Sequence, residues 1–317
     1  GIGIVSMLFR TNYLALTGGG RDPKFSPNNV TLWDDSKEKD IVKLEFRSEV
    51  KNVKLRRPSD QIIVVLANKV YVYTFSAQPK RLHMFETPDN EKGLVAVSTS
   101  KSLAVLAFPG RQPGHIQVVD LGQFIAAGTA SVSSVTTPLA NMTISSSIIA
   151  AHTAALGCLA MNAEGTLLAS ASDKGTLIRV FEALSGKLLH ELRRGADRAE
   201  IYSIAFSADS TRLCVSSDKG TVHVFNLDAA SSGAAQRSSS EESARLAFMK
   251  DLLPKYFSSE WSFAHCQLPT DSRCICAFGP ERNTIIVVCA DGGCYKFTFD
   301  PIKGGECIRE SYNRFLR

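Results

Sequence analysis

Apolar and polar residues alternate in short runs along most of the chain. In the run that begins at Val70, for example, Val70 and Val72 alternate with Tyr71 and Tyr73. A period of two puts successive side chains on opposite faces of a strand, whereas the helical period of 3.6 is nearly absent from this sequence. The runs are a few residues long and end at Gly, Asp, Asn or Pro, the residues that tight turns require. The pattern therefore predicts an all-β fold.

One stretch of the chain recurs at a fixed interval. The segment ASASDKGTLIRVF, from Ala169 to Phe181, returns as CVSSDKGTVHVFN, from Cys214 to Asn226. Their aspartates lie 45 positions apart (218 − 173). A third copy, VVCADGGCYKF, puts its Asp291 a further 73 positions along (291 − 218), and the excess of 28 (73 − 45) is close to the length of a Ser/Ala-rich insertion that starts near residue 229. The chain is built from repeats of about 45 residues.

Each repeat reads as four short strands, which at this period is typical of a β-propeller of the WD type. Trp33-Asp34, at the end of NNVTLWDD, occupies the position of the dipeptide that gives these repeats their name. We expect one β-propeller domain over 1–317 with six visible blades, spanning approximately 1–47, 48–87, 92–151, 153–195, 199–269 and 271–315. Because the chain begins without Met and directly in a first strand, a seven-bladed parent is favoured.

Composition agrees with a globular protein. The 317 residues are 44% hydrophobic and 21% charged, with a mean hydropathy of -0.01, which excludes a disordered chain. No run approaches the roughly 20 apolar residues that span a bilayer, and the start lacks the pattern of a signal peptide. The eight cysteines include no C-x-x-C pair and sit singly in apolar runs, so they are interpreted as small buried hydrophobes in a reducing compartment, with no metal site and no cofactor.

Two adjacent arginines end the fourth strand of one repeat, in the sequence Leu192-Arg193-Arg194-Gly195. Side chains of successive strand residues point to opposite faces, so Arg193 and Arg194 would serve different pockets if the strand continues through them. A guanidinium is a planar fork of donors that matches phosphate oxygens. One outer strand would then supply two phosphate-binding sites.

The repeated Asp-Lys-Gly-Thr turns add donors on either side of this strand. The turn of the arginines' own blade offers Ser172, Lys174 and Thr176, and the turn of the next blade offers four residues. These four are Ser217, Lys219, Thr221 and His223. An Arg-Arg pair on an edge strand is more usually a solvated rim that discourages aggregation, and Asp-Lys-Gly is ordinary turn chemistry. Spacing alone leaves both interpretations open.

Several stretches of this chain are similar to one known family. They are TGGGRDPKFSPNNVTLWDD, LAFPGRQPGHIQVVDL, GTLIRVFEALSGKLLHELRRG and LPKYFSSEWSF, and they extend over nearly the whole sequence. Together with the LRRG motif they resemble the PROPPIN family of autophagy-related propellers, within which the last stretch resembles the WIPI 3/4 and fungal Hsv-like branch.

The resemblance implies a seven-bladed propeller with two sites on its rim, for phosphatidylinositol 3-phosphate and phosphatidylinositol 3,5-bisphosphate. Carried over by position, the residues form two groups. The first site takes His152, Ser172, Thr176 and Arg193, and the second takes Arg194, Ser217, Lys219, Thr221 and His223.

The insertion after residue 226 carries a second membrane signal. Its first half is rich in Ser, Ala and Gly and predicts a flexible segment, so that 229–259 is expected to be a flexible membrane-facing loop. Its second half has apolar residues at helical spacing before Pro254. These are Leu246, Phe248, Met249, Leu252 and Leu253. Such a segment either inserts into the head-group layer of a membrane or covers the propeller, and the resemblance implies insertion.

The sequence thus predicts a peripheral membrane phosphoinositide-binding protein that acts as an effector and recruiter in autophagy. It is expected to be cytoplasmic and monomeric, associated with autophagosome-precursor, endosomal or vacuolar membranes. The resemblance implies a lipid-transfer partner, autophagy-related protein 2, and the candidate partner loop contains Pro23, Lys24 and Pro27. The alternative is a WD-repeat interaction scaffold without direct lipid binding. No enzyme motif stands in a suitable context, and no basic stripe suggests nucleic-acid binding.

Overall fold

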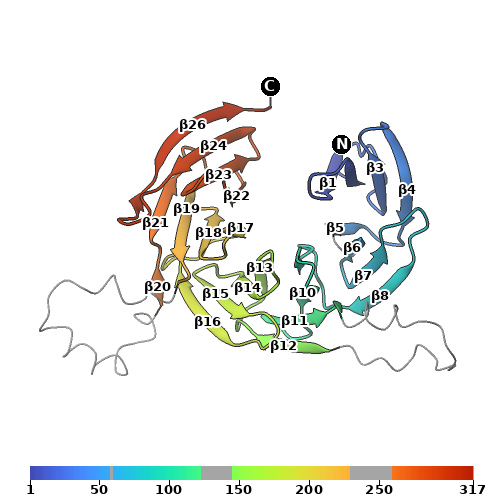
Figure 1. The fold of residues 1–317 in the computed structure, drawn as a ribbon, viewed down its shortest axis with the longest axis horizontal. Helices are drawn as coiled ribbons and strands as arrows, with labels where there is room; N and C mark the ends of the chain where they lie inside the picture. The colour runs from blue at the N-terminus through green and yellow to red at the C-terminus, as the bar shows by residue number, and fades with distance from the viewer. Residues whose placement is uncertain (58–59, 123–144, 229–258, 317) are drawn as a thin grey trace, which may run out of the picture. The chain divides into compact units, whose positions relative to one another are not determined.

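The computed structural model describes residues 1–57, 60–122, 145–228 and 259–316, and the 26 elements whose bounds lie in these ranges are β-strands (Figure 1). The chain divides into two compact units. The first contains residues 1–153, 163–166 and 183–186, and the second contains residues 154–162, 167–182 and 187–317. Each unit holds three sheets. A single domain over 1–317 stays a prediction.

The first unit is made of three four-stranded antiparallel sheets, in each of which consecutive strands are neighbours. The first sheet contains β1 (Ile2–Met7), β2 (Tyr13–Gly18), β3 (Asn29–Asp34) and β4 (Lys39–Glu45). The second contains β5 (Val50–Arg56), β6 (Gln61–Leu66), β7 (Lys69–Thr74) and β8 (Arg81–Glu86). The third contains β9 (Ala96–Val97), β10 (Val105–Pro109), β11 (His115–Asp120) and β12 (Ser146–Ala150).

The second unit also has three sheets, and two of them gain a fifth strand that pairs in parallel. Sheet 4 contains β13 (Leu156–Met161), β14 (Leu167–Ser172), β15 (Leu177–Glu182), β16 (Leu188–Arg193) and β20 (Glu260–Trp261). Sheet 5 contains β17 (Ile201–Phe206), β18 (Arg212–Ser217), β19 (Thr221–Asn226), β21 (Ala264–Gln267) and β25 (Gly305–Glu306). Sheet 6 contains β22 (Cys274–Phe278), β23 (Thr284–Cys289), β24 (Gly293–Thr298) and β26 (Ile308–Arg314).

Inner strands are buried on both faces, which explains their continuous apolar runs. Along β6, Ile62 and Val64 pack in the core shared with the first sheet, whereas Ile63 and Val65 pack in the core shared with the third. In the second unit, β18 divides in the same way, because Leu213 belongs to one core cluster and its neighbour Cys214 to the other. Alternate residues of one strand thereby join consecutive sheets face to face.

The all-β prediction is confirmed, with one sheet for each of the six repeats. Each repeat supplies the four antiparallel strands that were predicted, and sheets 4 and 5 each gain a fifth strand that was not. Their fifth strands come from connecting segments whose backbone pairs with an outer strand, a long-range contact that the alternation of side chains does not encode. The insertion lies between the third and fourth strands of sheet 5, as predicted, because β19 pairs with β21.

The cysteines of the second unit gather in one core. The buried thiols are Cys214, Cys266, Cys274, Cys276, Cys289 and Cys307. Burial raises the pKa of Cys289 to about 12, so this thiol stays protonated near neutral pH. All eight cysteines are free, and their interpretation as small buried hydrophobes is confirmed for these six, whereas Cys158 and Cys294 are partly exposed. Their gathering was not predicted, because they come from five separate segments of the chain.

Candidate functional site

The two arginines lie at the end of β16, the fourth of the four antiparallel strands in sheet 4. Arg193 is opposite Leu177 of β15, and the backbone N–H of Arg194 donates to Thr176 O at 3.0 Å. The hydrogen-bond ladder therefore runs one residue past the strand end, through both arginines. Within such a ladder, neighbouring side chains leave on opposite faces.

The guanidinium of Arg193 is buried, with 8% of the residue exposed. Its Nε donates to Ser259 Oγ at 2.7 Å, and Ser259 is buried as well. Ser259 is 66 residues away along the chain, immediately before β20, which pairs with β16. No sequence signal pointed to this serine, because its position depends on the parallel pairing of β20.

Arg194 is equally buried, at 7% exposure, but contacts a different set of groups. Its Nε donates to Gly175 O at 2.8 Å, and its Nη2 donates to Asp197 O. Burial lowers the pKa of Arg194, and the nearby carboxylates of Asp218 and Asp197 oppose this shift. The guanidinium remains charged, so a positive charge is held under the surface by main-chain carbonyls.

The turn between β14 and β15, which accepts the hydrogen bond from Arg194, requires a glycine at position 175. Gly175 has φ of +61°, and a Cβ on it would lie 1.9 Å from Ala199 O. Only glycine fits this left-handed position and this close approach. The N–H of Gly175 donates to the carbonyl of Ser172, a buried residue, and the carbonyl of Thr176 accepts from Arg194. Ser172 and Thr176 thus lie in the turn that adjoins the arginines.

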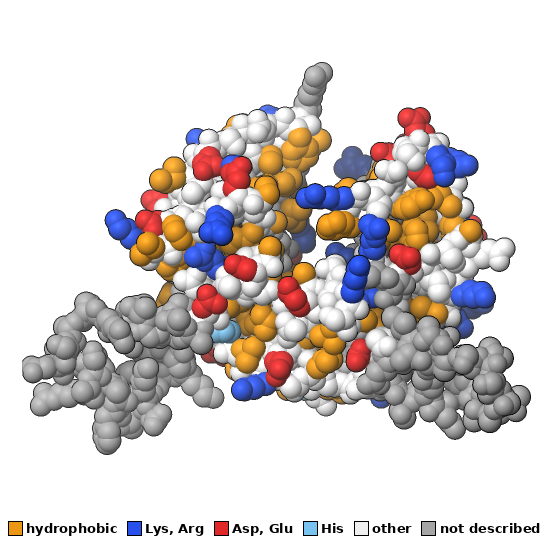
Figure 2. Space-filling view, in the orientation of Figure 1, with side chains coloured by type: hydrophobic (Ala, Val, Ile, Leu, Met, Phe, Trp, Pro, Cys, Tyr) orange, Lys and Arg blue, Asp and Glu red, His pale blue; other side chains and the backbone are white. Residues whose placement is uncertain are grey.

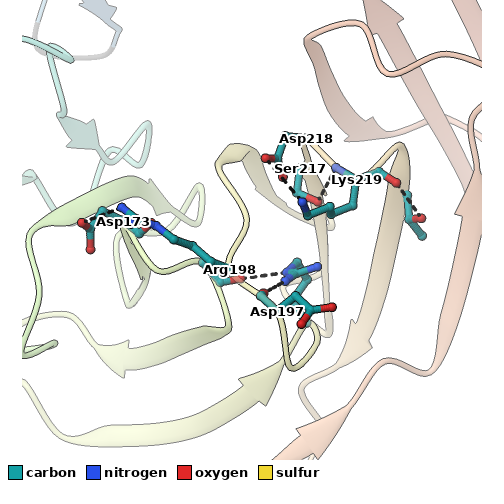
Figure 3. Close-up of polar contacts among 9 residues, drawn as sticks. Asp173, Asp197, Arg198, Ser217, Asp218 and Lys219 are labelled. Carbon is teal, nitrogen blue, oxygen red and sulfur yellow. Dashed lines mark hydrogen bonds and ion pairs between the residues drawn. The ribbon is translucent and has the colours of Figure 1, made fainter.

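Arg198 braces the same turn from outside. Its Nη2 lies 3.3 Å from Asp173 Oδ2, and its Nε donates to Asp173 O at 3.2 Å (Figure 3). The side chain is 72% exposed, so this pair contributes little to stability. Although Arg198 belongs to the segment leading to sheet 5, it contacts the turn of sheet 4.

The corresponding turn of sheet 5 holds three of the predicted second-site residues (Figure 3). Ser217 is buried, and its Oγ accepts from the N–H of Lys219 at 3.4 Å. The ammonium of Lys219 lies 3.9 Å from Asp218 Oδ2. Thr221 Oγ1 donates to Gln267 Oε1 at 3.0 Å, within its own sheet. These side chains form a hydrogen-bonded turn that resembles the turn of sheet 4.

His223, on β19 of sheet 5, has a pKa that is affected by the charge of Arg194. Burial, then the positive charge of Arg194 and the neighbouring His265, together lower its pKa to about 4. Its Nδ1 lies 3.2 Å from Ser262 Oγ. The imidazole is therefore neutral near pH 7, and its electrostatic coupling to Arg194 brings two of the predicted second-site residues together.

His152, predicted for the first site, belongs to the first unit, whereas Arg193 belongs to the second. It is buried, and its N–H donates to Gly114 O at 3.0 Å. Its participation beside Arg193 stays a prediction. The five apolar residues predicted for membrane insertion, Leu246, Phe248, Met249, Leu252 and Leu253, lie outside the described residues.

The candidate partner loop connects β2 to β3 in the first unit. Pro23 and Lys24 are exposed, while the N–H of Lys24 donates to Gly1 O at 2.8 Å. Pro27 O accepts from Val50 N at 2.9 Å, and the ammonium of Lys24 lies 5.8 Å from the centre of the Phe25 ring. The loop is thus tied to the body of the first unit at both ends and presents its proline and lysine outward.

Basic and acidic side chains are interspersed on the face that Figure 2 shows. The arginine pair is distinguished by its burial and by its hydrogen-bond partners. Across the described ranges, no group of three or more His, Cys, Asp or Glu side chains has a geometry that would hold a metal ion. Nor do those ranges contain a helix long and apolar enough to cross a bilayer.

Comparisons with known proteins agree with this architecture. The family model PROPPIN matches residues 4–314. SVP1-like protein 2 from Pichia angusta is 39% identical over 320 residues, covering 99% of this chain and 84% of the relative. Autophagy-related protein 18e from Arabidopsis thaliana is 39% identical over 320 residues, covering 100% of this chain and 77% of the relative.

The crystal structure of Hsv2 from Kluyveromyces marxianus superposes with a TM-score of 0.72 at 23% identity. The alignment covers 100% of this chain and 86% of that chain. At this identity the likeness concerns the fold alone, and the six sheets match those of a β-propeller. The predicted fold class is confirmed.

Proposed function

The chain belongs to the PROPPIN family, as its motifs predicted, and on this premise we propose that it binds phosphatidylinositol 3-phosphate and phosphatidylinositol 3,5-bisphosphate on membranes. PROPPINs are non-enzymatic, autophagy-related propellers that bind phosphoinositides and associate peripherally with membranes. The proposal assigns one head-group site to Arg193 and another to Arg194. The protein would act as an effector and recruiter in autophagy.

The observation that carries the proposal is the pair of adjacent buried guanidiniums with different partners. Arg193 donates to the hydroxyl of Ser259, whereas Arg194 donates to the main-chain carbonyls of Gly175 and Asp197. Burying a cation is costly, and charge-assisted hydrogen bonds to an anion offset part of that cost. A phosphate that approaches either guanidinium would form such bonds with it. This argument favours anion binding over a merely solvated edge, because both residues are buried.

Charge coupling supports the second site. Arg194 lowers the pKa of His223, so an anion bound between them would raise that pKa and let the imidazole take up a proton. Binding at this site would then strengthen as the pH falls below neutrality. Lys219 and Thr221 would add donors from the turn of sheet 5, and Ser217 would hold that turn through its bond to the N–H of Lys219.

The first site would combine Arg193 with Ser172 and Thr176 from the turn of its own sheet, and the role of His152 stays a sequence-based prediction. The insertion, with its apolar residues at 246–253, would enter the head-group layer beside the sites. Two head-group contacts and one apolar contact together anchor a protein far better than any one of them alone. We assign the protein to the cytoplasm, at autophagosome-precursor, endosomal or vacuolar membranes.

The test is flotation of the protein with phosphatidylcholine vesicles doped with each phosphoinositide in turn. Arg193→Thr with Arg194→Thr should weaken binding about a hundredfold or more, because charge-assisted bonds to two phosphates are lost. Arg193→Lys with Arg194→Lys keeps the charge and should retain part of the affinity. Thermal unfolding of each variant reports whether the buried contacts are needed for folding.

Arg179→Thr is the matched control, since Arg179 belongs to the same sheet and forms an ion pair with Glu191. Its Nε and Nη2 both donate to Glu191 Oε2, at 2.9 and 2.7 Å. Vesicle binding should therefore survive this change. If the Thr double variant is folded and still floats with 3-phosphorylated lipids, the assignment of the sites to the two arginines is wrong.

A cavity in the first unit supports a second function, recruitment of a protein partner. It has a volume of about 490 Å³ and is lined by aromatic and basic side chains, including Phe46, Tyr71, Tyr73 and Arg81. The N–H of Phe46 donates to Asn28 O, which joins the cavity to the partner loop that precedes β3. We assign autophagy-related protein 2, a lipid-transfer protein, to this side of the unit.

Recruitment can be measured separately from lipid binding. Tyr73→Ala together with Lys24→Ala should reduce capture of that partner while vesicle flotation stays unchanged. Full capture by this variant would refute the docking side, and loss of flotation would show that the change acts through the fold rather than through docking.

A further inference from the structure

Strand β20 is an unusual addition to sheet 4. This short strand, Glu260–Trp261, runs parallel to β16, with Glu260 opposite Leu192 and Trp261 opposite Arg193 (Figure 1). It becomes the outermost strand of the sheet on that side. A two-residue strand gains little from its backbone pairing, so side chains must hold it in place.

Two side-chain contacts fix β20 against the arginine strand. Ser259 Oγ accepts from Arg193 Nε at 2.7 Å, and both residues are buried. Glu260 Oε1 lies 3.0 Å from Nδ1 of His190, whose side chain is only 14% exposed. Two consecutive residues of the segment, Ser259 and Glu260, thus contact two residues of β16. These contacts fix the direction of the segment's backbone.

Trp261 is exposed in spite of this attachment. Its exposed fraction is 56%, and it follows directly after the two residues that hold the segment. A single exposed apolar residue is ordinary on a protein surface. Trp261 differs because its position is fixed opposite Arg193, at the edge where the proposed head-group site lies. An indole carries both an apolar body and a polar N–H, the combination that favours the membrane–water interface.

We propose that Trp261 enters the membrane–water interface when the arginine site holds a lipid head group. This inference rests on the proposed lipid-binding function. The partner is a lipid surface, because the residue across the ladder is a buried cation suited to a lipid phosphate and the indole is suited to the layer just beneath it. Ser259 and Glu260 act as positioning residues that keep the indole beside the arginine.

The chain offers a direct readout, since it contains only two tryptophans, Trp33 and Trp261. Trp33→Phe leaves Trp261 as the sole indole. With phosphatidylcholine vesicles containing phosphatidylinositol 3-phosphate, its emission should shift to the blue and become shielded from acrylamide. Soluble inositol 1,3-bisphosphate should occupy the site without this shielding. Should Trp33→Phe fold poorly, the difference between wild type and Trp261→Phe gives the same signal.

Affinity provides a second measurement. Trp261→Ser should weaken vesicle binding about tenfold, through loss of buried apolar area, while binding of soluble inositol 1,3-bisphosphate is unchanged. Ile308→Ser is the matched control, because Ile308 is 74% exposed on the outer strand of sheet 6. That variant should bind as wild type does.

Different results would contradict the proposed lipid binding and the inference about Trp261. Wild-type protein that does not float with any phosphoinositide vesicle defeats the proposed function and this inference with it. Protein that floats, but whose Trp261 emission and acrylamide quenching are the same with and without vesicles, defeats the inference alone. Equal affinity of Trp261→Ser and wild type would also defeat it.

Discussion

Sheets 4 and 5 are built from the same turn but end in different outer strands. The turns Asp173–Thr176 and Asp218–Thr221 have the same four residues, and both glycines have positive φ, +61° and +65°. In each sheet the third strand then pairs with an outer strand, β15 with β16 and β19 with β21. Because the same turn occurs in both sheets, the turn alone does not distinguish them.

The outer strands carry the difference. Arg193 lies opposite Leu177, and the residue opposite the equivalent Val222 is Cys266. Cys266 is fully buried in the core that sheet 5 shares with sheet 6, whereas Arg193 donates to the buried hydroxyl of Ser259. The same ladder position therefore holds a core thiol in one sheet and a hydrogen-bonded cation in the other. We therefore attribute the functional difference between sheets 4 and 5 to what packs over their outer strands, β16 and β21.

An arginine at the equivalent position of sheet 5 should destabilise that sheet. Cys266→Arg would bury a cation among apolar side chains and thiols, and we expect it to destabilise the fold by about 4 kcal/mol or more. Urea unfolding followed by circular dichroism measures this. The control, Gln267→Arg, changes an exposed neighbour and should cost less than about 1 kcal/mol. A stable Cys266→Arg protein would mean that the thiol core does not exclude an arginine.

The two turn glycines should differ in their tolerance of alanine. A Cβ at Gly175 would lie 1.9 Å from Ala199 O, whereas the nearest atom to a Cβ at Gly220 is Asp271 Oδ1, at 3.1 Å. Both replacements force alanine into the left-handed region, at about 1–2 kcal/mol. Gly175→Ala should lose more, about 3 kcal/mol in all, because a backbone clash is added. Equal urea midpoints for the two variants would contradict the geometry around Gly175.

The sequence predicted those features of sheets 4 and 5 that depend on local pattern. Strand alternation, the repeat and the turn residues encode six sheets, because each follows from short-range sterics and burial. The separation of Arg193 from Arg194 was an argument from strand geometry, and their different partners agree with it. Ser259 and β20 could not be predicted, since they depend on a parallel pairing across the long insertion. The coupling of His223 to Arg194 likewise needs the packing of two sheets.

At equivalent positions of the repeat, sheet 5 has a histidine and sheet 4 has an isoleucine. Only the histidine titrates, so the stability of sheet 5 depends on pH at this position. His223 stands where the repeat offset places Ile178, and its pKa is lowered from 6.5 to about 4 by burial and then by Arg194. The unfolded chain therefore takes up the proton first as pH falls. The stability due to the neutral imidazole is complete above pH 6.5 and is lost between pH 6.5 and 4, by about 2 kcal/mol at pH 5.

The measurement is the free energy of unfolding in urea at pH 7 and at pH 5. His223→Leu removes the titrating group, and other groups contribute equally to both proteins, so the difference between the two pH dependences isolates His223. We expect wild type to lose about 2 kcal/mol more than the variant over this interval. An identical loss in both proteins would mean that His223 is not held neutral.

The smallest expected effect on stability is at Gly195, which follows the arginines and has no counterpart glycine in sheet 5. Its φ lies outside the left-handed region, and a Cβ there would meet no heavy atom within 4 Å. Gly195→Val should therefore shift the free energy of unfolding by less than about 0.5 kcal/mol. Vesicle affinity should nevertheless fall several-fold, because the isopropyl group would occupy the open space through which a head group reaches Arg194. Unchanged affinity with unchanged stability would mean that the ligand approaches from another side, so this variant tests the direction of access without disturbing the fold.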